Sequence, residues 1–349
     1  MKKKTWLALL FVAAGAGCSR SGEVSSRWKL RPESESLVRD ERLRRQIYRA
    51  LDAAAKAGTD PPISHFKVRA ATVVDHEGRE HVIVGGNTEY QVPEAIHGET
   101  SLLNHVTTLL GVEATRRSVR FIAYYAERCG DSLSCGDCRD YQIATTNYER
   151  LLAVCGQASD YTVRIRRFSD AIVPEERFPA VPADGLPVSA SELQRLEGAA
   201  RQARQGGVRL FTAPERHTGA AALSYQGRVY RAAGVDDAAF HYRYPIGGVL
   251  QQAATEGDYF LKAILVGGEP GRWPWVSYRD RQYGYEFSSF NRRTGREPIR
   301  LILTDGAGRY RLTTFEEALP HAFSTDAFMP EAVERFLKTA LSQSARRLQ

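Results

Sequence analysis

The sequence lacks the features that identify several common classes of protein. No basic cluster is interleaved with aromatic residues, the pattern that a groove for single-stranded nucleic acid requires, so we expect no nucleic-acid partner. The N-terminal apolar run, Trp6 to Ala16, is too short to span a bilayer as a stable helix. No cysteine follows Cys155, so chemistry that depends on thiols is confined to the first half of the 349 residues.

The N-terminal segment instead has the pattern of an export signal. Three lysines, Lys2 to Lys4, precede the apolar run, and small residues lead from it to Cys18. A cysteine at this place resembles the cleavage site of a bacterial lipoprotein, and Ser19 after it is typical of the outer-membrane form. Gly15 stands where that pattern usually has leucine, so a plain signal peptide cleaved nearby is the alternative. We expect an exported protein of the cell envelope, anchored to the outer membrane through lipid on Cys18 and facing the periplasm or the surface. Loss of the three lysines would lower the formal net charge of +7 to +4, a mild excess over so large a surface.

The length of the chain suggests two core-sized units rather than one. In the first half, apolar residues recur at helical spacing between Glu41 and Lys56, and runs typical of strands follow. Helices and strands then alternate, which predicts a sheet with helices on its faces. The expected elements are a helix at 41–56, a hairpin of 66–74 and 81–85, a helix from about His97 to Leu110, a strand at 119–126, a helix starting near Cys135 and a strand at 161–168.

The second half repeats this order in outline. Residues 172–190 hold four prolines and little periodicity, which indicates a linker, and a hairpin, a loop, a helix and a strand follow. Alignment of the two hairpins places Tyr244 at the position of His97. Ile246 then falls at the position of Glu99, so we interpret the second half as a degenerate copy without the chemical groups of the first. The predicted organisation is a signal peptide at 1–18, a tether at 19–40, a catalytic domain at 41–171, a linker at 172–200 and a degenerate domain at 201–349.

Four residues of the first half form one set with a common chemistry. His97 stands at the start of a predicted helix, and Cys135 and Cys138 are three apart at the start of another. One nitrogen and two sulfurs would bind zinc tetrahedrally and leave the fourth position to water. Glu99 is then a carboxylate that can move protons without being a ligand, and the positive ends of the helix dipoles favour thiolates. A Cys-x-x-Cys alone is also compatible with a structural or redox role, so the prediction depends on the two motifs together.

His-x-Glu followed by Cys-x-x-Cys is the signature of zinc-dependent nucleobase deaminases. Residues 62–155 resemble the cytidine deaminases beyond that signature. Ser64–Ala71 is similar to the family's Ser-x-Phe-x-Val-Gly-Ala-Ala strand, and Gly86–Tyr90 resembles its Gly-x-Asn-x-Glu stretch. The form His-x-Glu-x-Ser-x-x-x-His, which begins at His97, looks most like the dimeric branch, in which each subunit has a degenerate second domain. The resemblance implies a three-layer α/β/α cytidine-deaminase-like fold, a bound Zn²⁺ ion and a homodimer.

The resemblance also implies roles for residues beside the metal ligands. Asn87 and Glu89 match family residues that hydrogen-bond the ribose hydroxyl, and Phe66 matches a residue near the pyrimidine ring. Gly98 and Ser134 match positions whose backbone faces the base and the departing amine. A polar turn after the hairpin is the alternative for the first two residues, and a core phenylalanine on a strand is the alternative for the third.

Three positions depart from the family pattern. Gly98 replaces the usual Ala, Ser134 replaces the Pro before the first cysteine, and Arg69 replaces a Gly. The interval from Glu99 to Cys135 is also longer than usual. These departures bear on the identity of the substrate more than on the reaction.

We therefore expect a zinc-dependent hydrolase that converts cytidine, deoxycytidine or a related amino-pyrimidine nucleoside to the uridine product and ammonia. One alternative is a deaminase of another amino-heterocycle, such as a nucleoside antibiotic. A second is a catalytically inactive binding protein anchored in the envelope. The sequence leaves open whether Cys129 and Cys155 form a disulfide, which would suit an oxidising compartment, or whether Cys129 competes as a metal ligand.

Overall fold

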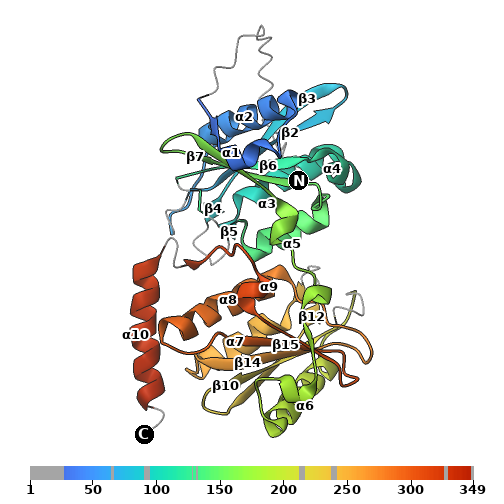
Figure 1. The fold of residues 1–349 in the computed structure, drawn as a ribbon, viewed down its shortest axis with the longest axis vertical. Coiled ribbons are helices and arrows are strands. Elements are labelled where there is room, and N and C mark those ends of the chain that lie inside the picture. The colour runs from blue at the N-terminus through green and yellow to red at the C-terminus, as the bar shows by residue number, and fades with distance from the viewer. Residues whose placement is uncertain are drawn as a thin grey trace, which may run out of the picture.

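The structure, a computed structural model, describes residues 27–63, 67–89, 95–127, 129–130, 133–211, 217–236, 242–325 and 329–346. It consists of two layered α/β units, one from each half of the chain, stacked along the long axis of the molecule (Figure 1). The layered α/β class expected from the sequence is confirmed. The predicted signal peptide with its candidate lipid site Cys18, and the candidate substrate residue Phe66, lie outside the described residues.

The first unit is built on a six-stranded sheet in the order β1-β8-β7-β6-β2-β3. β2 and β3 form the predicted hairpin, whose turn has Glu77 and Gly78 at positive φ. β2 runs antiparallel to β6. Because β6 runs parallel to β7, the C-terminal ends of β6 and β7 lie at the same edge of the sheet. The strands are β1 (Lys29–Leu30), β2 (Arg69–His76), β3 (Arg79–Gly86), β6 (Phe121–Ala126), β7 (Leu152–Gln157) and β8 (Thr162–Arg167), with a small separate pair of β4 (Thr88–Glu89) and β5 (Ala95–Ile96).

Helices cover both faces of this sheet and give the unit its two core layers. Because successive strand residues point to opposite faces, Ala71 packs in the core under α2, whereas its neighbour Ala70 packs in the core under α3. The side chain of Asp40 accepts a hydrogen bond from the N–H of Arg42 and so caps α2, which has the predicted bounds. The helices are α1 (Pro32–Glu35), α2 (Glu41–Lys56), α3 (Gly98–Leu110), α4 (Val112–Ser118) and α5 (Gly136–Thr145).

The second unit has a six-stranded sheet in the order β11-β10-β14-β15-β16-β9. It repeats the first sheet from its edge inward, with a hairpin, an antiparallel step, a parallel step and another antiparallel step. Only the last strand differs, since β1 is parallel to β8 whereas β9 is antiparallel to β16. The strands are β9 (Ala180–Val181), β10 (Gly219–Ser224), β11 (Val229–Ala233), β14 (Leu261–Gly267), β15 (Arg300–Thr304) and β16 (Tyr310–Thr314), with a separate pair of β12 (Val235–Asp236) and β13 (Tyr242–Arg243). The helices are α6 (Ala190–Gln205), α7 (Pro245–Thr255), α8 (Tyr278–Arg293), α9 (Phe315–Ala318) and α10 (Pro330–Arg346).

Parts of the predicted tether and linker belong to the folded units, which differs from the sequence prediction. Within the tether at 19–40, Trp28 is 3% exposed and β1 pairs with β8. Within the linker at 172–200, β9 joins the second sheet and α6 already begins. Two-residue strands leave no periodic pattern in a sequence, which explains why β1 and β9 were not predicted. The start of α6 did have a signal, a capping box between Ser189 and Glu192.

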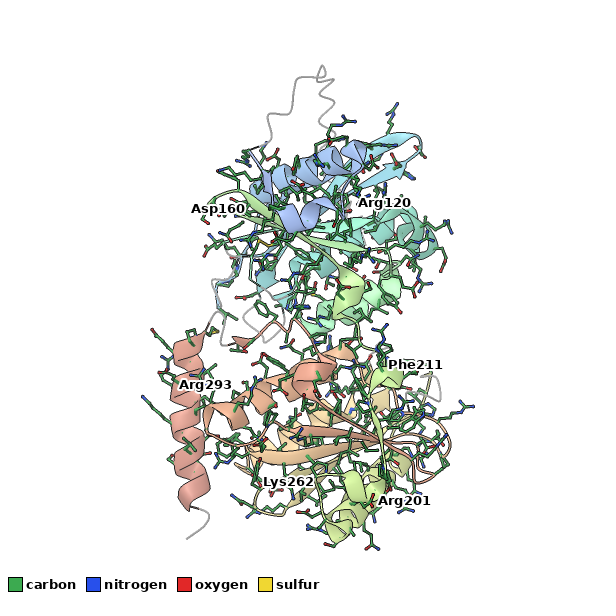
Figure 2. All side chains as sticks on the ribbon, viewed as in Figure 1. Arg120, Asp160, Arg201, Phe211, Lys262 and Arg293 are labelled. Carbon is green, nitrogen blue, oxygen red and sulfur yellow. A yellow bond between two sulfur atoms is a disulfide. The ribbon has the colours of Figure 1, made fainter. Side chains whose placement is uncertain are left out.

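The two units meet where α5 packs against α8, near the centre of the molecule (Figure 1). The C-terminal helix α10 packs beside the second unit, with the ring of Phe336 against those of Tyr259 and Phe290. Figure 2 shows Arg293 beside this helix, where it pairs with Glu334 at 3.8 Å. Among the described residues, no helix combines the length and the apolar character needed to cross a membrane.

Cys129 and Cys155 are joined by a disulfide, which decides between the two alternatives that the sequence left open. Cys155 lies in β7 and Cys129 in the loop after β6, with 5.8 Å between their Cα atoms. The sulfur of Cys129 is therefore used in this bond and is not a metal ligand.

Replacement of both disulfide cysteines by alanine should lower the free energy of unfolding by about 2–4 kcal/mol, because the crosslink restricts the unfolded chain. Urea denaturation of the wild type and the double variant measures the difference. A reducing agent should destabilise the wild type and leave the variant unaffected. Equal unfolding midpoints for the two proteins would contradict the expectation.

Candidate functional site

Three side chains of types that can hold a metal ion meet where two helices begin. His97 is the N-cap residue of α3 and Cys135 that of α5, while Cys138 lies in the first turn of α5. The Nδ1 atom of His97 lies 3.1 Å from the Sγ atom of each cysteine. The structure thus brings together the three residues that the sequence singled out as ligands, each at or next to a helix N-terminus.

Two glycines allow the close approach that puts these helices in place. A Cβ atom on Gly85 of β3 would overlap the backbone of Leu102 in α3. A Cβ atom on Gly136, at the start of α5, would overlap the carbonyl of Tyr278 at the start of α8. The helix that carries the histidine therefore rests directly on the sheet, and the helix that carries the cysteines rests directly on the second unit.

The donor set fits a zinc ion. The three donor atoms lie within 4.8 Å of one another, and Cys135 and Cys138 are not bonded to each other. Zinc held by two sulfurs and a nitrogen needs edges of roughly 3.5 Å between its ligands, close to the separations seen here. Three protein ligands leave one coordination position for water or substrate, which is the composition of a catalytic zinc site.

The three ligands also shift one another's protonation. The hydrogen bond with Cys135 raises the pKa of His97 to about 9. Hydrogen bonds from Cys138 and His97 lower the pKa of Cys135 well below its usual value, whereas burial raises the pKa of Cys138. Protons on His97 and Cys138 must leave when a metal binds, so we expect the affinity for zinc to weaken as the pH falls.

Glu99 is a buried acid beside this cluster. It lies in the first turn of α3 and its side chain is 6% exposed. Burial raises the pKa of Glu99, and the negative charge of Cys135 adds to this effect. A carboxyl group whose pKa is moved toward neutrality can both accept and return a proton, which is what a general acid and base requires.

Two of the residues assigned to substrate binding, Asn87 and Gly98, lie against the backbone of Val68. The N–H of Val68 donates to Oδ1 of Asn87 at 2.9 Å. A Cβ atom on Gly98 would lie 3.0 Å from the carbonyl oxygen of Val68, a tight contact, so alanine would force a small adjustment. Oε2 of Glu89 accepts a hydrogen bond from the N–H of Ile63 at 2.8 Å. The assigned contacts of Asn87, Glu89 and Gly98 with a nucleoside stay predictions.

Ser134 makes polar contacts through both its backbone and its side chain. Its carbonyl oxygen, assigned to the departing amine, accepts a hydrogen bond from Nε of the buried Arg139 at 2.8 Å. Its hydroxyl instead lies 2.9 Å from both the hydroxyl of Tyr124 and Nε2 of Gln142. The side-chain contacts of Ser134 are thus with Tyr124 and Gln142.

Sequence reasoning missed three residues that surround this serine. Tyr124 lies in an apolar strand that had no polar pattern to mark it. Arg139 follows the second cysteine directly and is fully buried, and nothing in the sequence distinguishes it from a surface arginine. Gln142 had one signal, because it is four residues after Cys138 and so lies on the same face of α5.

The corresponding corner of the second unit holds a carboxylate where the first holds the metal ligands. Tyr244 and Ser277 are the N-cap residues of α7 and α8, which correspond to α3 and α5. Asp280 falls at the position of the second cysteine. Its carboxylate accepts hydrogen bonds from the N–H groups of Ile246 at 3.0 Å and Gly247 at 2.8 Å. Asp280 therefore links the starts of α7 and α8 as a metal would link those of α3 and α5.

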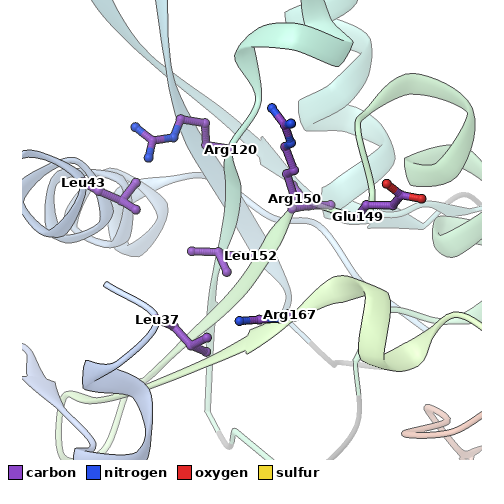
Figure 3. Close-up of a pocket in the computed structure, with 8 residues that line it drawn as sticks. Leu37, Leu43, Arg120, Glu149, Arg150, Leu152 and Arg167 are labelled. Carbon is purple, nitrogen blue, oxygen red and sulfur yellow. The ribbon is translucent and has the colours of Figure 1, made fainter. Parts of the chain in front are cut away.

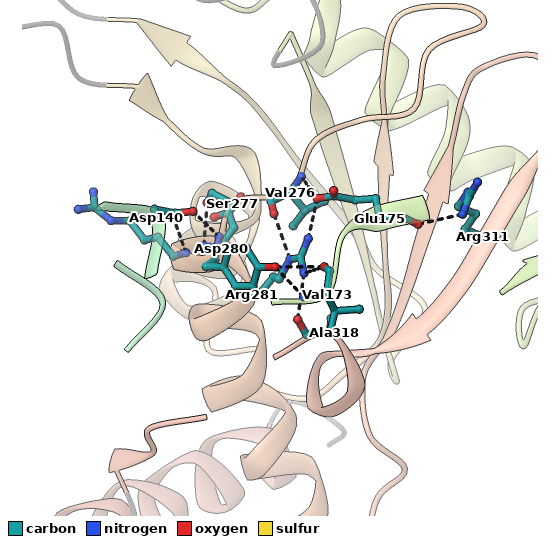
Figure 4. A network of polar contacts seen from close by, with 11 residues as sticks. Asp140, Val173, Glu175, Val276, Ser277, Asp280, Arg281, Arg311 and Ala318 are labelled. Atoms are coloured by element: carbon teal, nitrogen blue, oxygen red, sulfur yellow. Dashed lines mark hydrogen bonds and ion pairs between the residues drawn. The ribbon is translucent and has the colours of Figure 1, made fainter. Parts of the chain in front are cut away.

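A buried polar network joins the cysteine helix to the second unit. The carboxylate of Asp140 in α5 accepts hydrogen bonds from the N–H groups of Tyr278 and Arg279, both at 2.9 Å. Behind them, the buried guanidinium of Arg281 pairs with Glu175 at 2.6 Å, and Figure 4 shows this pair beside the start of α8. The position of α5 is thus set by the second unit as well as by its own sheet.

A separate cavity of about 320 Å³ lies at the other end of the central strands. Arg120 precedes β6 there and Leu152 begins β7, whereas Cys135 follows the far end of β6. Figure 3 shows the side chains of Arg120 and Arg150 pointing in different directions. Neither histidine nor cysteine lines this cavity, so it offers none of the chemistry described above. The lining residues are Leu37, Leu43, Arg120, Glu149, Arg150, Leu151, Leu152 and Arg167.

No family model matches the chain, and no curated protein matches it. Part of the chain is similar to solved structures of cytidine deaminases. The enzyme from Burkholderia pseudomallei is 26% identical over 37% of this chain and 94% of its own, with a TM-score of 0.30. That from Mycobacterium tuberculosis is 24% identical over 38% and 94%, with a TM-score of 0.27. That from Mycobacterium leprae is 20% identical over 38% and 97%, with a TM-score of 0.26. At TM-scores this low, a functional proposal depends on the chain's own site residues.

Purified protein should contain one zinc ion per chain, and Cys138→Ser should lose most of it, because two remaining ligands cannot hold the metal tightly. Elemental analysis after gel filtration measures both. The double alanine variant of the Cys129–Cys155 disulfide is the matched control and should keep its zinc. Wild-type protein without zinc, or equal zinc in Cys138→Ser, would contradict the proposed ligand set.

The carboxyl of Asp280 should make stability depend on pH. Burial raises the pKa of Asp280 to about 7, so the folded protein keeps a proton that the unfolded chain has lost. The stability that this group contributes is therefore greatest at low pH and falls as the pH rises toward 7, by up to about 1.4 kcal/mol per pH unit. Urea denaturation of wild type and Asp280→Asn across this range isolates the effect. The difference, wild type minus variant, should fall with pH and level off above 7, and a flat or rising difference would be the contrary result.

Proposed function

We propose that the chain is a zinc-dependent hydrolase that deaminates cytidine, deoxycytidine or a related amino-pyrimidine nucleoside. The observation that carries the proposal is the position of Glu99, a buried carboxyl with a raised pKa beside three metal ligands. A structural zinc site has four protein ligands and no use for an acid that does not bind the metal. The combination seen here is the one that hydrolysis requires.

The residues of the site account for each proton in the reaction. Zinc held by His97, Cys135 and Cys138 would lower the pKa of a water molecule toward about 7 and so make hydroxide available. Glu99 would accept the proton of that water and pass it to N3 of the pyrimidine ring. Attack of the hydroxide at C4 then forms a C–O bond. Glu99 would take the proton of the new C4 hydroxyl group and deliver it to the exocyclic nitrogen as the C–N bond breaks, which leaves a carbonyl at C4. The products are the uridine nucleoside and ammonia.

Recognition of the sugar is assigned to Asn87 and Glu89, on the short segment between β3 and α3. An amide and a carboxylate together can distinguish a donor from an acceptor on a sugar hydroxyl. The substrate range also depends on Arg69, whose guanidinium lies over the ring of Tyr125 at 5.6 Å and so occupies space that glycine would leave open. The homodimer and the lipid anchor at Cys18 stay predictions of the sequence.

Glu99→Ala should lower the rate of ammonia release from cytidine by about 10²- to 10⁴-fold, because the proton transfers assigned to this carboxyl are lost. Zinc content should stay at the wild-type level. Glu149→Ala, at an exposed position away from the site, is the matched control and should keep full activity. Full activity of Glu99→Ala would show that the role given to this residue is wrong.

A screen of aminated bases and nucleosides with the zinc-loaded wild type separates the remaining alternatives. Release of ammonia from cytidine or deoxycytidine supports the proposal as stated. Release only from another amino-heterocycle would retain the reaction and replace the substrate. Binding of a nucleoside without ammonia release would favour the inactive binding protein.

A further inference from the structure

The start of α8 is capped in part by a side chain from the other unit. The hydroxyl of Ser277 accepts from the N–H of Asp280 at 3.0 Å, but the N–H groups of Tyr278 and Arg279 have no acceptor within the helix. The carboxylate of Asp140 in α5 accepts both at 2.9 Å, one on each oxygen, and Figure 4 shows Asp140 beside Ser277. A negative side chain at the positive end of a helix is stabilising. An aspartate of the cysteine helix therefore completes the cap of α8.

The contact between the two helices is reciprocal. Gln282 has the same place in α8 as Asp140 has in α5, five residues after the N-cap. Oε1 of Gln282 accepts from the N–H of Gly136, the first residue of α5, at 3.4 Å. Nε2 of Gln282 donates to Glu286 at 3.0 Å, which orients the amide. Each helix thus provides an acceptor for the start of the other, and neither start can move alone.

Asp140 belongs to the same short helix as two of the three candidate metal ligands. It is two residues after Cys138, and Cys135 is the N-cap of the helix. His97 belongs instead to α3, which rests on the sheet of the first unit. A site of this kind requires its donor atoms to be held within about 0.5 Å. The contact with α8 therefore helps to set where the two sulfurs lie relative to the imidazole.

We propose that Asp140 is a positioning residue for the metal ligands, and that the second unit serves the site by fixing the cysteine helix through it. Zinc binding and the contact between Asp140 and α8 are then coupled, so that each stabilises the other by the same factor. The inference rests on the zinc site of the proposed function and not on the identity of the substrate. Asp140 acts through α5 and touches neither metal nor substrate.

Zinc affinity, measured by competition with a chromophoric chelator at constant pH, tests the proposal. Asp140→Ala should weaken zinc binding about 10- to 100-fold, the loss usual for residues that orient metal ligands. Arg279→Ala is the matched control, because it removes a surface ion pair with Asp137 but keeps the N–H that Asp140 accepts. It should change the affinity less than about fivefold. Wild-type affinity in Asp140→Ala, or equal losses in the two variants, would overturn the proposal.

Hydrogen exchange of the wild type tests the coupling in the other direction, without a substitution. Zinc should slow exchange of the amide hydrogens of Tyr278 and Arg279 by the same factor of about 10 to 100, because opening of this contact costs zinc affinity. The internal control is the pair of N–H groups at the start of α7 that Asp280 holds within the second unit. These should respond little to zinc. In Asp140→Ala the effect of zinc on the start of α8 should disappear.

The outcomes separate this inference from the proposed function. Zinc that leaves exchange at the start of α8 unchanged, or slows it equally at the starts of α7 and α8, would overturn the inference. A deaminating wild type with unaffected zinc affinity in Asp140→Ala would do the same and leave the proposed function standing. Coupling in a protein that deaminates no aminated base would refute the reaction and support the inference. Wild-type protein that binds no zinc would overturn both.

Discussion

The chemistry of this protein depends on two helices that begin side by side, so that Nδ1 of His97 lies 3.1 Å from both thiol sulfurs. The positive ends of α3 and α5 favour a thiolate, and the imidazole and the second thiol lower the pKa of Cys135 further. Gly85 lets α3 rest on the sheet and Gly136 lets α5 rest on the second unit, because a Cβ atom at either position would overlap the neighbouring backbone. Backbone packing therefore comes first, and the ligand set and the placement of Glu99 follow from it.

The second unit shows what this corner of the fold requires when no metal is involved. The carboxylate of Asp280 in α8 accepts two hydrogen bonds from backbone N–H groups at the start of α7. A carboxylate thus joins the two helices at the position that corresponds to the candidate metal site. The unit also has a direct effect on the first, since Tyr278 and Arg279 donate to Asp140 in the cysteine helix. The described residues of the second half form no candidate metal cluster, yet this half helps to hold the half that has one.

Much of the site could be predicted from the sequence, because its ligands belong to short motifs at helix starts. His97 with Glu99, and Cys135 with Cys138, are recognisable by spacing alone, and the structure confirms that three of them meet. The cluster of Tyr124 and Gln142 could not be predicted, because it joins residues from separate elements that no common spacing relates. The role of Asp280 could not be predicted either, because it is recognised only when α8 is compared with α5.

The fold could be predicted from the sequence to a similar extent. The helix at 41–56 has strong periodicity and was placed at its observed bounds, whereas β1 and β9 are two residues long and have no periodic pattern. The family pattern gave a backbone role to Ser134, which stays a prediction. The structure adds a buried arginine that donates to that carbonyl. This contact depends on packing around Arg139, which the sequence does not encode in any local pattern.

X-ray absorption spectroscopy at the zinc edge tests the central claim most directly, because it counts the atoms bound to the metal in the purified protein. The account predicts two sulfurs at about 2.3 Å, with one nitrogen and one further light atom at about 2.0 Å. A shell of four sulfurs, a shell with none, or protein in which Cys135 and Cys138 are bonded to each other would contradict it.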